Sequence, residues 1–140
     1  QELEILNRLE KDVFRSVQSV ASIDEVAFLQ GLTTRVYIDD AVKKYIIEIV
    51  NATRNPSKYI NAKYAEYITL GASTRGAIAL MDAAKAIALM RGKNYVTPED
   101  VKVLVHSVLR HRITLNYAAV ADGVTEEEII DAIVGAIQTP

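Results

Sequence analysis

The chain has 140 residues, half of them apolar and 24% charged, which is typical of one globular domain and excludes a disordered tail. Its 16 basic and 18 acidic residues give a net charge of −2, so we expect no nonspecific binding of nucleic acid. It has no cysteine, so it can form neither disulfides nor a cysteine-ligated zinc site. No uncharged run approaches the roughly 18 residues of a membrane span, so we expect a cytoplasmic protein without membrane insertion.

The first third of the chain predicts two helices. A helix over about residues 2–20 would place five apolar side chains near one face: Leu3, Leu6, Val13, Val17 and Val20. Ser22 and Glu25 have the spacing of a capping box, which predicts a second, short helix with Val26 and Leu29 on its apolar face. Because the chain begins at Gln1 inside a helical pattern, we expect it to be a fragment of a longer protein.

An extended segment and a strongly amphipathic helix follow. The alternation over residues 35–38 predicts a short strand, and Asp39–Asp40 offers the next N-cap. Apolar or small side chains then recur at steps of three and four: Val42, Tyr45, Ile46, Ile49, Val50 and Thr53. The helix should end before Asn55–Pro56, because a residue that precedes proline disfavours the helical conformation. Residues 56–72, which include three tyrosines, indicate a loop of uncertain form.

Three more elements are predicted after residue 72. Ser73 or Thr74 can cap a helix that runs to about Arg91, and its many alanines favour close contact with neighbouring helices. Thr97–Asp100 predicts a further helix start, and a buried stripe should follow: Val101, Leu104, Val105, Val108 and Leu109. Residues 113–115 suggest a second strand, paired with the segment near Val36. A capping box over 125–128 opens a last helix that carries Ile129, Ile130, Ile133, Val134 and Ile137.

Together these elements predict an all-α fold, a small bundle of five to six helices around one core with at most a two-stranded β ribbon. The sequence shows no self-contained active site, because it lacks a glycine-rich phosphate loop and the histidine spacing of a metal site, so no metal ligands are predicted. We expect His106 to border the core and His111 to complement a helix C-terminus. The acids at helix starts are expected to act as caps: Glu99, Asp100 and Glu126–Glu128.

Arg75 is harder to explain as a purely structural residue. It falls in the first turn of a predicted helix, where a cation is unfavourable by about half a kcal/mol because the helix N-terminus is already positive. An anion bound there would reverse that cost, since free amides and a guanidinium would converge on it. Gly71 would let the backbone turn tightly or approach a partner. The alternative is an exposed arginine, or one paired with a carboxylate elsewhere in the core.

Several motifs in order resemble one family. Residues 71–75, Gly-Ala-Ser-Thr-Arg, resemble the second-sensor motif in the lid domain of MoxR-type AAA+ ATPases. Further matching segments keep the family's order and spacing over nearly the whole chain: 29–30, 45–46, 52–54, 83–88, 91–101 and 108–112. One departure is Thr74, where the family often has proline, but threonine can still help to cap the helix.

The resemblance implies that residues 1–140 are a single helical lid domain, with an α/β nucleotide-binding domain upstream that holds the phosphate loop and the Mg²⁺ ligands. Arg75 would be the sensor-2 arginine that contacts the γ-phosphate of ATP. Weaker nucleotide contacts would come from Gly71, Ser73 and Thr74. The candidate interface residues are Arg54, whose simpler role is to complement its helix dipole, Arg110 and Arg112. ATP and Mg²⁺ would be cofactors of the parent protein, a predicted ATPase, and the fragment alone would bind neither and be inactive.

The resemblance also implies partners. Family members form rings, typically hexamers, that mature or activate other complexes such as methanol dehydrogenase, often with von Willebrand A-type proteins. Two alternatives stay open beside this hypothesis. A free-standing helical interaction module would use Ile129, Ile133 and Ile137 of the last helix to hold a partner. A helix-turn-helix DNA binder would use Arg110 and Arg112, but the chain lacks a basic recognition helix.

Overall fold

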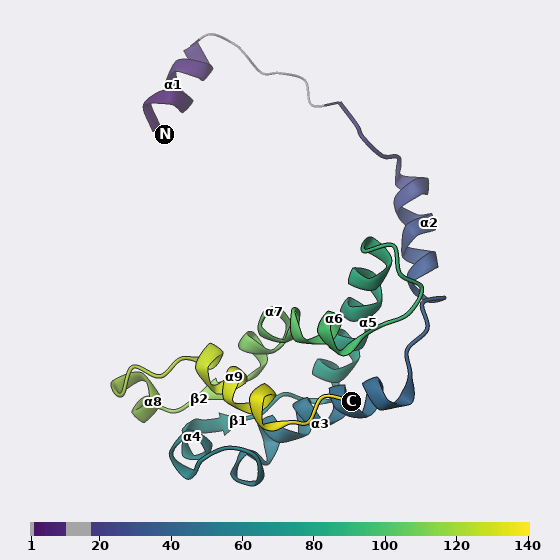
Figure 1. The fold of residues 1–140 in the computed structure, drawn as a ribbon. Helices are drawn as coiled ribbons and strands as arrows, with labels where there is room; N and C mark the ends of the chain where they lie inside the picture. Colours follow the sequence, from purple (N-terminus) through teal and green to yellow (C-terminus); the bar gives the residue numbers. More distant parts are fainter. Residues whose placement is uncertain (1, 11–17) are drawn as a thin grey trace.

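The computed structural model describes residues 2–10 and 18–140, which form nine α-helices, two 3₁₀ helices and one two-stranded sheet (Figure 1). The predicted all-α class with a minor β ribbon is therefore confirmed. None of the described helices is both long and apolar enough to cross a membrane. In chain order the elements are α1 (Glu2–Glu10), α2 (Ile23–Thr33), α3 (Asp40–Arg54), η1 (Pro56–Lys58), α4 (Ala62–Tyr67), β1 (Ile68–Leu70), α5 (Thr74–Met90), α6 (Pro98–Lys102), α7 (Val105–Leu109), η2 (Arg110–Arg112), β2 (Thr114–Leu115), α8 (Tyr117–Ala121) and α9 (Glu126–Ala136).

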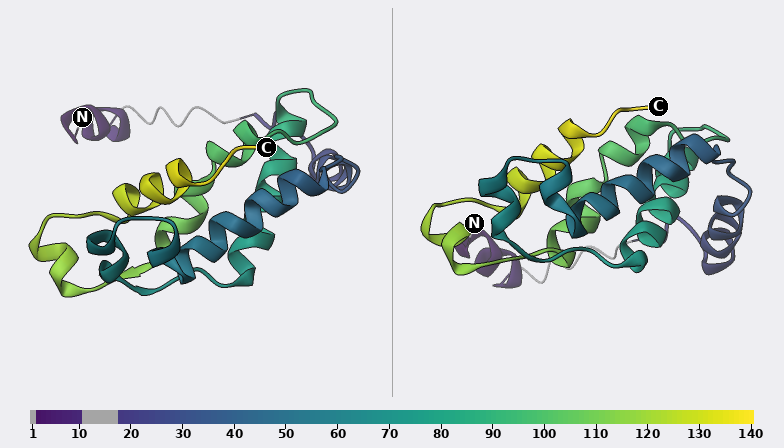
Figure 2. Two further views of the ribbon diagram at one scale, coloured as in Figure 1. Left: turned by 60° about the horizontal axis from the view of Figure 1, so that its bottom comes forward. Right: turned by 90° about the horizontal axis from the view of Figure 1, so that it is seen from below.

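Helix α3 is the centre of the fold and lies between α5 and α9 (Figure 2). The Asp39 carboxylate caps it by accepting from the Ala41 amide at 2.8 Å. All six residues of its predicted stripe are buried, and it ends at Arg54, before Asn55–Pro56, as expected. On α5 the buried positions recur every four residues and are mostly small: Gly76, Leu80, Ala84 and Ala88. Such a row lets the backbone of α5 approach α3, α6 and α7 closely.

The N-terminal prediction is only partly correct. Helix α1 ends at Glu10 and residues 18–20 are not helical, while Val13 and Val17 lie outside the described residues. Leu3, Leu6 and Val20 are exposed, so these three residues form no buried stripe. The capping box of Ser22 and Glu25 is confirmed. Helix α2 packs beside α5, yet none of its side chains is buried, and the predicted apolar face with Val26 and Leu29 stays about half exposed.

The predicted strand pairing is wrong. Strand β2 pairs antiparallel with β1, with Ile68 opposite Leu115, and not with the segment near Val36. Tyr37 instead forms an isolated parallel bridge with Tyr95, in which the Val96 amide donates to the Tyr37 carbonyl at 2.9 Å. The error arose because β1 has only three residues and follows α4 with no turn between them, so it gave no separate strand signal.

Two further stretches differ from the prediction in detail. The segment 56–72 is ordered as η1, α4 and β1, and the Tyr67 hydroxyl donates to the Asp122 carboxylate, which also lies 3.1 Å from the Lys63 ammonium. The helix predicted from Thr97 onward is two short helices, α6 and α7. The isoleucines that the interaction-module hypothesis assigned to a partner are buried in the core: Ile129 and Ile133 of α9, and Ile137 directly after it. That alternative therefore loses its binding surface.

Asp100 is a charged residue inside this core, with no solvent-exposed surface. Its carboxylate accepts from the Arg91 guanidinium at 2.6 Å, from the Lys93 ammonium and from the Thr97 amide at 2.9 Å. Burial alone raises the pKa of this carboxyl, but the hydrogen bonds from Lys93, Thr97 and Arg91 outweigh burial and lower the pKa to about 2. The predicted capping role is confirmed, and the residue also ties α6 to the end of α5.

Candidate functional site

The start of α5 differs in charge from the other long helices of the bundle. Ser73 is its N-cap residue and has an extended backbone, but it forms no side-chain cap, and Thr74 is the first helical residue, so the predicted side-chain cap by Ser73 or Thr74 is wrong. At α2, α3 and α9 a serine, an aspartate and a threonine fill that role. The first turn of α5 contains no acid and carries Arg75. Free amides, the helix dipole and a guanidinium therefore make this end of α5 attractive to an anion.

The Arg75 side chain is exposed. Across residues 2–10 and 18–140 no hydrogen bond or ion pair holds its guanidinium. The alternative of an internal carboxylate partner therefore finds no support in the described part of the chain. A free guanidinium at an uncapped helix start can bind a phosphate or carboxylate without first breaking an internal hydrogen bond or ion pair.

Gly71 makes the close approach that the sequence suggested, but its neighbour is the chain's own helix α3. A Cβ on Gly71 would lie 2.3 Å from the Thr53 carbonyl oxygen and 2.8 Å from the Arg54 nitrogen, so no other residue fits without a backbone shift. The Thr53 hydroxyl accepts from the Ala72 amide at 2.9 Å. The end of α3 thus holds the segment that leads into α5, with the Arg54 backbone beside Gly71.

The other candidate arginines divide into two groups. Arg112 lies beside the first turns of α5, with its Cδ 3.6 Å from where a Cβ of Gly76 would stand, and its guanidinium donates to the Val108 carbonyl. Arg110 faces α9 instead, with its Nη1 3.3 Å from a carboxylate oxygen of Glu127. The structure therefore places the Arg54 backbone beside Gly71 and the Arg112 side chain beside Gly76, on the segment that carries Arg75, whereas Arg110 lies against α9.

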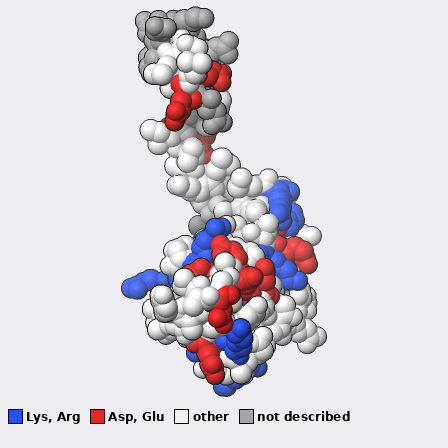
Figure 3. Space-filling model, turned by 90° about the vertical axis from the view of Figure 1, so that its left-hand side faces the viewer, with Lys and Arg blue, Asp and Glu red and all other residues white. Residues whose placement is uncertain are grey.

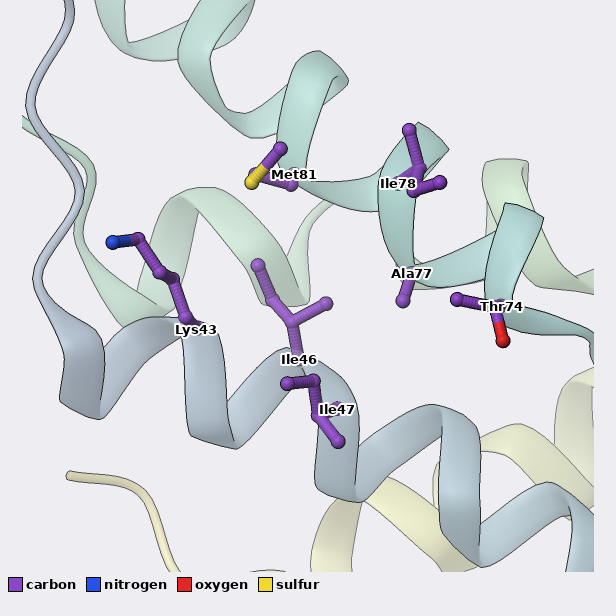
Figure 4. Close-up of a pocket in the computed structure, with 7 residues that line it drawn as sticks. All are labelled: Lys43, Ile46, Ile47, Thr74, Ala77, Ile78 and Met81. Atoms are coloured by element: carbon purple, nitrogen blue, oxygen red, sulfur yellow. The ribbon is translucent and has the colours of Figure 1, made fainter.

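An apolar groove of about 220 Å³ runs between α3 and α5 and ends at Thr74, next to Arg75 (Figure 4). Ile47 and Ile78 at its edge are 57% and 51% exposed. Sequence reasoning missed this groove. The signal available was that both isoleucines fall outside the buried stripes of their helices. The groove is lined by Lys43, Ile46, Ile47, Thr74, Ala77, Ile78 and Met81.

The remaining candidates behave as structural residues. His106 is partly exposed and its Nε2 lies 2.9 Å from a carboxylate oxygen of Asp131. Glu128 completes the capping box with Thr125, as predicted. Among the described residues no group of three or more acidic or histidine side chains gathers in a way that could hold a metal ion. On the face in Figure 3, acidic and basic side chains are intermixed over the body of the molecule.

The family comparison gives one match. A family model described as an AAA lid domain matches residues 61–133, just over half of the chain. The matched segment runs from the residue before α4 into α9, and it includes Gly71, Arg75 and the whole of α5.

Curated relatives cover more of the chain. The protein YeaC of Bacillus subtilis is 37% identical over 142 residues, which span all of this chain and 41% of YeaC. Chaperone MoxR1 of Mycobacterium tuberculosis is 31% identical over 88% of this chain and 33% of its own length. Protein MoxR of Paracoccus denitrificans is 33% identical over 63% of this chain and 27% of its own length. The chain thus spans about two fifths or less of each of these relatives.

A solved structure shares the fold. It is a crystal structure of a protein from Cytophaga hutchinsonii, described as a candidate ATPase, with a TM-score of 0.86 and 39% sequence identity. The match covers 99% of this chain and 42% of that protein, so the solved protein also contains a large part that this chain does not represent.

Proposed function

We propose, from the premise that this chain belongs to the AAA lid domain family, that it is the lid of a MoxR-like ATPase and closes over ATP bound to an α/β domain of the same protein. The family match and the two relatives named MoxR support this assignment. The relatives are more than twice as long as the chain, which leaves room in each for a nucleotide-binding domain.

The observation that carries the proposal is the free, exposed guanidinium of Arg75 at the uncapped start of α5. The residues present fit a polyanion, because this helix end has no competing acid in its first turn. In the closed protein Arg75 stabilises negative charge at the γ-phosphate, in the role of a sensor-2 arginine. The backbone amides that follow Ser73 and Thr74 point to the same anion, and Gly71 sets the path of the chain into them.

The groove beside Thr74 fits the same arrangement. The apolar edge formed by Ile47 and Ile78 lies on the side of α5 next to Arg75, so a domain that delivers a phosphate to Arg75 would also cover these side chains. Helix α5 then couples the state of the nucleotide to the orientation of the lid. When Arg75 gains or loses its contact with the γ-phosphate, the rigid helix that carries it moves as well.

The wider assembly follows from the same assignment. We propose that the parent protein uses ATP and Mg²⁺ in the cytoplasm and forms a ring of subunits, with the metal ligands in its nucleotide-binding domain. Arg54 and Arg110, both exposed, are candidates for contacts with neighbouring subunits. The ring would act as a chaperone-like motor that matures or activates other protein complexes, with a von Willebrand A-type protein as a candidate partner.

Replacement of Arg75 tests the proposal. In the full-length protein we expect Arg75→Ala to lower the steady-state rate of ATP hydrolysis on the order of a hundredfold, as loss of one preorganised donor to a developing oxyanion does. The thermal unfolding temperature should stay that of the unmodified protein, because the side chain is exposed and forms no hydrogen bond or ion pair with the described residues. Hydrolysis is measured by phosphate release, and stability by circular dichroism.

Arg35→Ala is the matched control, because Arg35 is likewise exposed but lies before α3 and away from the start of α5. Its rate of ATP hydrolysis should equal that of the unmodified protein. An unchanged rate in Arg75→Ala would remove this residue from the mechanism and, with it, the proposed function of the site.

A further inference from the structure

Thr53 is a buried polar residue with a fully satisfied hydroxyl. Its side chain has no exposed surface, and its Oγ1 donates to the Val50 carbonyl at 2.7 Å while it accepts from the Ala72 amide at 2.9 Å. The first bond lies within the last turn of α3, and the second crosses to a residue 19 positions later. One hydroxyl therefore joins the end of α3 to the segment before α5.

Gly71 completes this connection from the other side. Its missing Cβ allows the backbone of residue 71 to lie directly on the Thr53 carbonyl and the Arg54 nitrogen. We call the two contacts, the Thr53–Ala72 hydrogen bond and the Gly71 backbone contact, the Thr53–Gly71 joint. The joint fixes residues 71–73, which have no regular secondary structure, to α3, the most buried helix of the bundle.

The joint lies immediately before the residue on which the proposed function depends. Ala72 is three positions ahead of Arg75, and the start of α5 has no side-chain cap of its own. The Thr53 hydroxyl is thus the side-chain anchor for the backbone that leads into Arg75. An error of about 1 Å in the position of a charge-stabilising group can cost on the order of a hundredfold in rate, so such an anchor affects turnover.

We propose that Thr53 is a positioning residue for ATP hydrolysis: it holds the start of α5 so that Arg75 meets the γ-phosphate. This proposal rests on the proposed function, because it needs Arg75 to act on the nucleotide. Thr53 itself touches no substrate. It acts through the Ala72 amide and the backbone of α5, and its loss matters only as long as the guanidinium at residue 75 is present.

The experiment is a double-mutant cycle in the full-length protein, with ATP turnover as the readout. Thr53→Val keeps the shape of the side chain but removes the hydroxyl, and Thr53→Ser keeps the hydroxyl. We expect Thr53→Val to lower turnover about tenfold and Thr53→Ser to stay within about twofold of the parent. In an Arg75→Ala background Thr53→Val should lower turnover less than about twofold, because the group that it positions is gone.

Folding is controlled separately. Each variant is assayed at a temperature at which circular dichroism shows it folded. Ile38→Val serves as a destabilised control, because Ile38 is buried just before the start of α3, at the opposite end of that helix from Thr53. This control should leave turnover unchanged.

The outcomes separate the two proposals. An equal loss from Thr53→Val in both backgrounds would mean that Thr53 only supports the fold, and would overturn the positioning role. Normal turnover in Thr53→Val together with impaired turnover in Arg75→Ala would overturn the positioning role and leave the proposed function intact. Normal turnover in Arg75→Ala would overturn both.

Discussion

At the scale of single residues, Asp100 offers a test of what holds the lid together. Its carboxylate is buried and receives hydrogen bonds from Arg91, Lys93 and Thr97. We expect Asp100→Asn to lower the free energy of unfolding at pH 7 by about 2 kcal/mol, because two cations lose their charged partner. Urea unfolding followed by circular dichroism measures the change.

The contribution of Asp100 to the free energy of unfolding should depend on pH. The pKa of Asp100 falls from its ordinary value of 3.8 to about 2 in the folded chain, so its contribution is complete above about pH 4 and is lost as the pH falls through 2. The pH-dependent part is about 1 to 2 kcal/mol, reduced because the Arg91 side chain is 44% exposed to water. The gap between the parent and Asp100→Asn should therefore shrink between pH 4 and pH 2.

Asp40→Asn is the matched control for this measurement. Asp40 also forms an ion pair, with the Lys43 ammonium 2.8 Å away, but its side chain is 83% exposed. An exposed pair contributes little, so we expect Asp40→Asn to lower the free energy of unfolding far less than Asp100→Asn does. A loss as large as that of Asp100→Asn would contradict the view that burial makes the difference.

The contacts of Asp100 show which single-residue interactions could be predicted from the sequence. The Thr97–Asp100 spacing predicts the capping box, because that contact is local along the chain. The ion pairs with Arg91 and Lys93 were not predicted, since they depend on the turn after α5 folding back over α6. For the same reason the sequence identified Arg75 as unusual but did not show that it is free of internal partners.

At the scale of elements, Gly71 tests the contact between α3 and the start of α5. In Gly71→Ala the new Cβ would stand 2.3 Å from the Thr53 carbonyl oxygen, and backbone cannot move aside cheaply. We expect a loss of about 2 to 3 kcal/mol in the free energy of unfolding, from strain of the kind that overpacking causes. Chemical denaturation of the lid provides the measurement.

Gly135→Ala is the corresponding control on α9. A Cβ there has no heavy atom within 4 Å, and the residue lies inside a helix. It should stabilise the chain by about 0.5 to 1 kcal/mol, because alanine favours the helical conformation more than glycine does. Equal effects of the two substitutions would show that the close approach at Gly71 is not what constrains it.

The elements themselves were largely predictable where the pattern is long. Helices α3 and α9 follow from apolar spacing and caps, and α5 follows from its long run of alanines although its start has no side-chain cap. The pairing of β1 with β2 was not predictable. Strands of three and two residues are too short to show an alternating pattern, and tertiary contacts decide which strands pair. Helices α4 and α8 have only six and five residues, and sequence reasoning found neither.

At the scale of the whole molecule, the groove between α3 and α5 predicts which face of the lid is covered in the parent protein. We expect Ile78→Asp to lower ATP turnover of the full-length protein about tenfold, because closure would have to bury a new carboxylate. The side chain is about half exposed in this chain, so the fold should tolerate the change. Phosphate release at saturating ATP is the assay.

Val120→Asp on α8 is the comparison, since Val120 is 69% exposed and does not line the groove. Val120→Asp should leave ATP turnover within about twofold of that of the unmodified full-length protein. If both substitutions lowered turnover equally, the covered face would not be the one beside Arg75. The sequence could not predict this face, because Ile47 and Ile78 come from different helices and meet only in the folded bundle.

Helix α2 has a consequence for how the lid moves. Helix α2 docks on α5, but none of its side chains is buried, so it adds little buried apolar surface to the bundle. We therefore expect the backbone of α2 to open locally at a lower free energy than that of the buried helices. Such local opening would let α2 change its angle to the bundle while the start of α5, where Arg75 lies, keeps its structure.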